Sequence, residues 1–118
     1  MKTAPNNIEK LEPEQIFVFG NNTRGVHGLG AAKTAHKKFG AKMGVGRGLT
    51  GQCYALPTKD FDIETLPLYD IEQEIILFLK CAEENSDKEF LVTAFGTGLA
   101  GYKHEDIAKL FRGKKIPN

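Results

Sequence analysis

The residues best suited to chemistry lie near the end of the chain, where an apolar run passes into glycines in residues 90–102 (FLVTAFGTGLAGY). The apolar residues predict a buried strand, and a helical pattern follows from about His104. Glycines let main-chain N–H groups approach an anion without side chains in the way, and a helix N-terminus adds a favourable dipole. Residues 96–101 are therefore predicted to bind phosphate, with tight turns as the alternative role of these glycines.

The same segment spells GxGxxG, but the rest of the chain does not fit a dinucleotide-binding fold. That fold needs a further strand with an acidic residue about 20 residues on, and no second apolar strand follows Gly101. Residues 46–51 (GRGLTG) also spell GxGxxG, although they lead into a strand rather than a helix. The sequence has no GxxxxGK[ST] phosphate loop.

A second polar, glycine-rich loop is predicted over residues 21–30 (NNTRGVHGLG). Asparagine side chains both donate and accept hydrogen bonds, which suits a pair of ribose hydroxyls, and they also tolerate unusual turn backbones. Arg24 is either a phosphate contact or a solvated charge. His27 is a candidate catalytic or ligand-contacting residue, and its alternative role is that of a polar surface side chain.

Two more candidates follow a predicted strand end in residues 55–60 (ALPTKD). Thr58 is a candidate hydrogen-bonding partner for a ligand, and Asp60 is either a turn cap or an acid–base group. Lys59 is expected to be solvated. Paired catalytic carboxylates are not evident, and the spacing alone identifies no Ser–His–Asp or Cys–His arrangement.

Three apolar runs predict the strands that position these loops. Residues 16–19 (IFVF) stop at Gly20, residues 52–56 (QCYAL) stop at Pro57, and residues 89–95 form the strongest strand pattern. In a parallel sheet the ligand crevice lies outside the carboxyl ends of the strands. The three loops are therefore expected to open on one edge of the sheet.

Helical patterns alternate with these strands. The first covers residues 31–39 with Gly40 at its C-terminal end, the second runs from Asp70 to about Glu84 with a capping box completed by Gln73, and the last covers residues 104–111. This alternation predicts an α/β domain with a mainly parallel sheet.

Size and composition are those of an ordinary soluble domain. The chain has 118 residues, 41% hydrophobic and 26% charged, with a formal net charge of +1. We predict a single domain over residues 1–118, with a loose lead-in at 1–15 and a frayed tail at 113–118. The near-neutral charge makes nucleic acid an unfavoured partner.

Cys53 and Cys81 form no CxxC pair and have no neighbouring histidine cluster, so neither a metal site nor a cofactor is expected. Both are predicted to be small buried hydrophobic residues rather than reactive thiols. The N-terminal residues lack an apolar signal core, and no apolar run reaches ~18 residues. The expected location is the cytoplasm, without a membrane partner.

Three segments together resemble the macro-domain family. Asn21 and Asn22 are followed by GVHGLGAA, residues 48–59 read GLTGQCYALPTK, and residues 91–102 read LVTAFGTGLAGY. Their order along the chain also agrees with that family. The resemblance implies a compact three-layer α/β/α sandwich that binds ADP-ribose or a related nucleotide.

The resemblance also implies which residues contact the ligand. Asn21 or Asn22 would meet the distal ribose. Backbone groups near the ribose and the diphosphate would belong to Gly25, Gly28 and Gly30. The loop around the diphosphate would consist of Gly96, Thr97, Gly98, Leu99 and Gly101.

The leading hypothesis is a module that binds ADP-ribose or another NAD-derived nucleotide, free or attached to a protein. If the protein is an enzyme, the expected reaction is hydrolysis at the distal ribose, with a water positioned by Asn22 and with His27 or Asp60 as acid or base. Binding without fast turnover is favoured because no convincing general base stands out. The alternative is a structural or interaction protein, such as a homodimer formed through the apolar helix face of residues 71–82.

Overall fold

One mainly parallel sheet forms the centre of the protein. The computed structural model describes all residues except 5–7, 27–29, 94–101, 115 and 118. Within the described residues the strands are β1 (Lys2–Thr3), β2 (Gln15–Asn22), β3 (Gly48–Thr50), β4 (Cys53–Lys59) and β5 (Glu89–Val92). They lie in the order β1-β5-β2-β4-β3. All neighbours are parallel except β3, which is antiparallel to β4.

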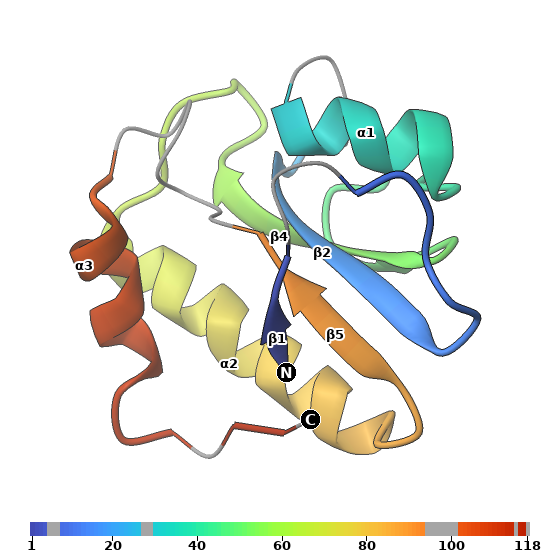
Figure 1. Ribbon diagram of the computed structural model, residues 1–118. Helices are drawn as coiled ribbons and strands as arrows, with labels where there is room; N and C mark the ends of the chain where they lie inside the picture. The colour runs from blue at the N-terminus through green and yellow to red at the C-terminus, as the bar shows by residue number, and fades with distance from the viewer. Residues whose placement is uncertain (5–7, 27–29, 94–101, 115, 118) are drawn as a thin grey trace.

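Helices connect the strands on both faces of this sheet. The helices are α1 (Gly30–Lys38), α2 (Leu68–Glu84) and α3 (His104–Ala108), which continues into the 3₁₀ turn η1 (Lys109–Phe111). Figure 1 shows α1 on one side of the sheet and α2 with α3 on the other. The predicted α/β class and the mainly parallel sheet are confirmed.

Alternation along the two central strands divides the core between the faces. Phe17 and Phe19 of β2 belong to the cluster under α1, whereas Ile16 and Val18 belong to the cluster under α2. Successive strand residues point to opposite faces, and both faces of these parallel strands are covered, so the strands read as continuous apolar runs. In β4, Cys53 and Ala55 likewise belong to the cluster under α1, and Tyr54 and Leu56 belong to the cluster under α2.

The apolar face of α2 is buried against the sheet. Its buried hydrophobic residues are Ile71, Ile75, Phe78, Leu79 and Ala82. The ring of Phe78 lies 4.9 Å from the ring of Tyr54 and 5.7 Å from that of Phe90, measured between centroids. The helix face that the homodimer hypothesis assigns to a partner is thus already covered within the chain.

Three strand boundaries differ from the predictions. β5 ends at Val92 and leaves Thr93 outside the strand, whereas the predicted run extends to residue 95. β2 continues through Gly20 to Asn22, because β4 extends equally far and pairs with it. Pro57 lies inside β4 rather than ending it. β3 pairs only with residues 53–55 of β4, so the missing N–H of Pro57 falls beyond the β3 ladder, where a proline is tolerated.

The start of α2 and the chain ends also differ from expectation. Pro67 precedes the helix and no side chain caps it, so Asp70 lies within the first turn and does not form the predicted capping box. Residues 2–3, expected in a loose lead-in, pair with β5 as strand β1. In the tail, Lys114 donates a hydrogen bond of 2.8 Å to Glu72 on α2.

Burial of Cys53 predicts a pH-dependent stability. Burial raises the pKa of its thiol from 9.0 to about 12, and burial also raises the pKa of Tyr54. The folded state therefore keeps protons that the unfolded chain releases, so the stabilisation is complete below about pH 9 and is lost as the pH rises toward 12. The urea midpoint is expected to fall between about pH 8 and about pH 10.5. The fall should be smaller in Cys53→Ala, and equal midpoints in the wild type at the two pH values would contradict the expectation.

Candidate functional site

The parallel strands β2, β4 and β5 all finish at the same end of the sheet, which we term the carboxyl edge (Figure 1). The segments at the ends of β2 and β4 are joined there by hydrogen bonds. The Thr23 N–H donates to the Lys59 carbonyl at 3.1 Å, and the Thr58 hydroxyl donates to the Asn21 carbonyl at 3.4 Å. The expectation that these two loops meet at one edge is confirmed.

Asn21 has an unsatisfied amide at this edge. The residue is 4% exposed, and its Nδ2 is buried without a hydrogen-bond partner among the described residues. Its Oδ1 accepts a hydrogen bond of 3.3 Å from Asn22 Nδ2, which leaves the Nδ2 group as the free donor. A buried donor without an acceptor costs about 1–3 kcal/mol, so such groups call for an explanation.

Asn22 closes the loop that follows β2. Its Oδ1 accepts from the Val26 N–H at 3.1 Å, and its Nδ2 donates to the Val26 carbonyl at 3.0 Å. This pair of bonds fixes residues 22–26, which we term the site loop. The role that the structure gives to the Asn22 side chain is therefore to order the site loop, and its amide has no donor left over for a water.

The predicted ligand-contacting glycines Gly25 and Gly30 lie in different settings. Gly25 is buried, with φ +80°, and its N–H donates to the Asn22 carbonyl at 3.0 Å. Gly30 is the exposed first residue of α1, with open space around the position of a Cβ. Of these two described glycines, Gly30 is the one that presents backbone at the surface, where the positive end of the α1 dipole also lies.

Asp60 caps its own loop, as one of its two predicted roles required. Its Oδ1 accepts hydrogen bonds from the N–H groups of Asp62 at 2.9 Å and Glu64 at 3.0 Å. Its own N–H donates to the Glu64 carbonyl at 2.8 Å. The carboxylate thereby stabilises the turn that allows Ile63 its positive φ of 64°.

This geometry predicts different outcomes for two changes at Asp60. Asp60→Ala removes the acceptor of both N–H groups and is expected to lower the free energy of unfolding by about 1–2 kcal/mol. Asp60→Asn keeps an oxygen in the same place and is expected to cost less than half as much. Urea denaturation of the two variants measures the difference. Equal losses of stability would show that the charge, rather than the hydrogen-bond acceptor, orders the loop.

The remaining predicted site residues lie outside the described residues. They are His27, Gly28, Gly96, Thr97, Gly98, Leu99 and Gly101. Their proposed roles in catalysis and in diphosphate binding therefore stay predictions.

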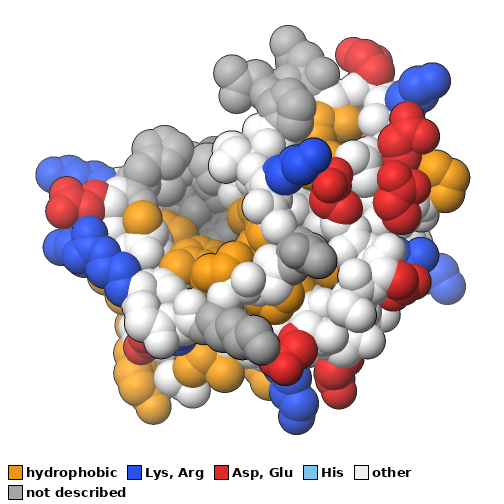
Figure 2. All heavy atoms as spheres, turned by 60° about the horizontal axis from the view of Figure 1, so that its bottom comes forward, with side chains coloured by type: hydrophobic (Ala, Val, Ile, Leu, Met, Phe, Trp, Pro, Cys, Tyr) orange, Lys and Arg blue, Asp and Glu red, His pale blue; other side chains and the backbone are white. Residues whose placement is uncertain are grey.

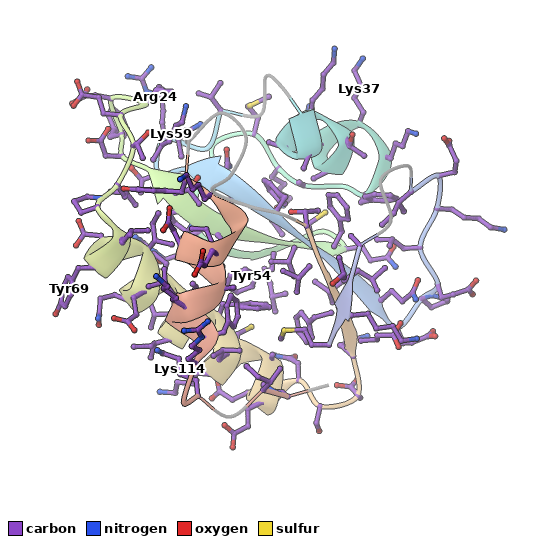
Figure 3. The ribbon with its side chains drawn as sticks, turned by 60° about the vertical axis from the view of Figure 1, so that its left-hand side comes forward. Arg24, Lys37, Tyr54, Lys59, Tyr69 and Lys114 are labelled. Carbon is purple, nitrogen blue, oxygen red and sulfur yellow. The ribbon has the colours of Figure 1, made fainter. Side chains whose placement is uncertain are left out.

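Cationic side chains also lie at the carboxyl edge. Figure 3 shows Arg24 and Lys59 at the same end of the sheet. The Arg24 guanidinium carbon lies 4.8 Å from the centre of the Phe61 ring, a cation–π contact that orients the guanidinium. Arg24 is exposed and Lys59 is half-buried, so the edge carries positive charge next to the buried Asn21 amide.

No protein-family model matches the sequence, and no curated protein or solved structure matches it.

Sequence reasoning assigned no role to Arg47 and Glu74, which form a bidentate ion pair. Arg47 Nε donates to Glu74 Oε1 at 2.7 Å, and Nη2 donates to Oε2 at 2.5 Å. The hydrogen bond with Glu74 raises the pKa of Arg47. One signal was available, because Glu74 falls on the apolar face of α2 between Ile71 and Ile75, where a carboxylate needs a partner.

A pocket of about 370 Å³ lies at the opposite end of the sheet, where β2 and β5 begin. Its described lining residues are Pro13, Ile16, Leu49, Gly51, Gln52, Asn85, Lys88 and Phe90. The side-chain amides of Gln52 and Asn85 already donate to the carbonyls of Glu12 and Cys81. Lys88 is the one charged residue in this lining, so the pocket offers no acid–base pair.

No group of three His, Cys, Asp or Glu side chains within the described residues is placed to hold a metal ion. None of the described helices combines the length and apolar composition needed to cross a bilayer. Figure 2 shows a face on which the surface is hollowed over hydrophobic side chains.

Proposed function

We propose that this protein binds ADP-ribose or a related NAD-derived nucleotide at the carboxyl edge of its sheet. The observation that carries the proposal is the buried Nδ2 group of Asn21, which lacks an acceptor among the described residues. A ribose hydroxyl or a phosphate oxygen would supply that acceptor and remove the cost of leaving the donor unpaired. The chemistry of the edge thus favours a polyhydroxylated, anionic ligand.

The surroundings of Asn21 support the same ligand class. The N-terminus of α1 and the exposed backbone of Gly30 lie at this edge and favour negative charge. Arg24 and Lys59 add positive charge beside it (Figure 3). Helices on both faces of a mainly parallel sheet are also what a macro-like, three-layer sandwich would require.

The proposal favours binding over fast turnover. Asn22 has no acid–base group and uses its amide to order its own loop, and Asp60 uses its Oδ1 to cap a turn. A general base needs a free acceptor within reach of the proton that it removes. We therefore infer a binding module whose ligand is either the free nucleotide or an ADP-ribosylated protein.

Calorimetric titration tests the proposal directly. We expect heat of binding with ADP-ribose and a weaker response with adenosine, which lacks the diphosphate. No binding at millimolar ADP-ribose would refute the proposed function. Incubation with an ADP-ribosylated protein and with ADP-ribose 1″-phosphate then tests turnover, because release of ADP-ribose would refute the pure-binder view.

Asn21→Leu is expected to separate ligand binding from stability. Leucine has a similar shape and removes the unpaired Nδ2, although it also removes the oxygen that accepts from Asn22, so the free energy of unfolding should change by less than about 1 kcal/mol. Affinity for ADP-ribose should fall about tenfold, the equivalent of one hydrogen bond. Asn22→Ala is the contrasting variant, since it removes the bonds to Val26 and should lower stability. Unchanged affinity in Asn21→Leu would show that the amide does not contact the ligand.

A further inference from the structure

We propose that Arg47 and Glu74 are positioning residues for the carboxyl edge. Neither residue belongs to the predicted ligand contacts. Their ion pair fixes residues 44–47, which we term the brace loop, and the brace loop in turn holds the site loop that follows Asn21.

The brace loop and the site loop are packed backbone against backbone. The Gly44 N–H donates to the Gly25 carbonyl at 2.8 Å. A Cβ on Gly46 would lie 2.5 Å from the Thr23 carbonyl oxygen and 2.6 Å from that of Asn22. Such separations leave no space for a side chain, so a shift of the brace loop must move the site loop as well.

The ion pair anchors the brace loop to a rigid element. Glu74 is 9% exposed and belongs to the buried face of α2, next to Ile75, which is fully buried. Arg47 directly follows Gly46, and its Nε and Nη2 groups each donate to a different oxygen of the Glu74 carboxylate. A bidentate pair restricts orientation as well as distance, which a single hydrogen bond does not.

A continuous chain of contacts therefore runs from α2 to the side chain of Asn22. It passes from Glu74 to Arg47, through Gly46 to the Asn22 and Thr23 carbonyls, and on to the bonds between Asn22 and Val26. The effect on ligand affinity rests on the proposed function, whereas the effect on the site loop does not.

The experiment compares Arg47→Met with Lys114→Met. Lys114 also forms an ion pair with α2, at 2.8 Å to Glu72, but Figure 3 shows it far from Arg24 and the carboxyl edge. The measurements are amide hydrogen exchange at Val26 and Gly44 and the affinity for ADP-ribose. We expect exchange about tenfold faster and affinity about tenfold weaker in Arg47→Met, with both unchanged in Lys114→Met.

Two further variants keep the test sharp. Arg47→Met leaves a buried carboxylate unpaired, so Glu74→Gln, which leaves no buried charge, should reproduce the faster exchange in a folded protein. Arg47→Lys retains the positive charge but cannot donate the two parallel hydrogen bonds of a guanidinium. Its amide exchange at Val26 should therefore be slower than in Arg47→Met and faster than in the wild type. Equal exchange at Val26 in Arg47→Met and Lys114→Met would overturn the inference.

The two proposals fail in different ways. If the wild type binds no ADP-ribose and the Arg47 variants still exchange faster at Val26, the proposed function fails and the bracing role stands. If the wild type binds and Arg47→Met binds equally well, the positioning role is overturned and the proposed function stands.

Discussion

Gly25→Ala is expected to lower the free energy of unfolding by about 3–4 kcal/mol. Gly25 has φ +80°, a conformation that costs an L-residue about 1–2 kcal/mol. The new Cβ would also lie 2.3 Å from the Gly44 carbonyl carbon and 2.5 Å from the Val45 nitrogen, so backbone would have to move. Urea denaturation measures the loss.

Gly44→Ala is the matched control for that variant. Gly44 has φ +93°, and nothing lies within 4 Å of its Cβ position, so alanine there adds strain without a collision. We expect a loss of about 1–2 kcal/mol. If the two alanine variants were equally unstable, conformational strain alone would explain both, and the tight packing of the brace loop against the site loop would be contradicted.

Phe78→Ala is expected to cost about 3–5 kcal/mol. Phe78 is fully buried between the rings of Tyr54 and Phe90, so truncation leaves a cavity between α2 and the sheet. Because α2 also carries Glu74, the same change should loosen the anchor of the brace loop. Thermal and urea unfolding measure the loss of stability.

Leu77→Ala, one position earlier on α2, is the control for Phe78→Ala. Leu77 is 49% exposed, and its replacement is expected to cost less than about 1 kcal/mol. A loss as large as that of Phe78→Ala would mean that Leu77 is covered in solution, and it would reopen the hypothesis of a partner on this helix.

The sequence predicted the elements whose signals are local. The apolar run 16–19 and the periodicity of residues 71–82 identify β2 and α2, because burial of a strand or of one helix face repeats at a fixed spacing. The boundaries at Pro57 and Asn22 depend on how far neighbouring strands extend. That information is not contained in either segment.

The candidate site was only partly predictable for a similar reason. Asn21 and Asn22 stand out by type, but the sequence does not show how their hydrogen bonds differ. Asn22 bonds to Val26, whereas the Nδ2 of Asn21 is buried without an acceptor among the described residues. Arg47 and Glu74 are 27 residues apart, and no local pattern pairs them. The close approach of Gly46 to the site loop is likewise a tertiary contact between two segments that both read simply as glycine-rich.

The two halves of the core are unequal, and this has a consequence for how the protein opens. The helix α2 itself buries large side chains such as Phe78 and Leu79, whereas α1 itself buries only the small residues Ala32 and Ala35 within Gly30–Lys38. Apolar burial contributes in proportion to area, so α1 is held less firmly than α2. Partial unfolding should therefore begin on the α1 side, and proteases should cleave there first. The carboxyl edge would then be lost while the larger half of the molecule stays folded.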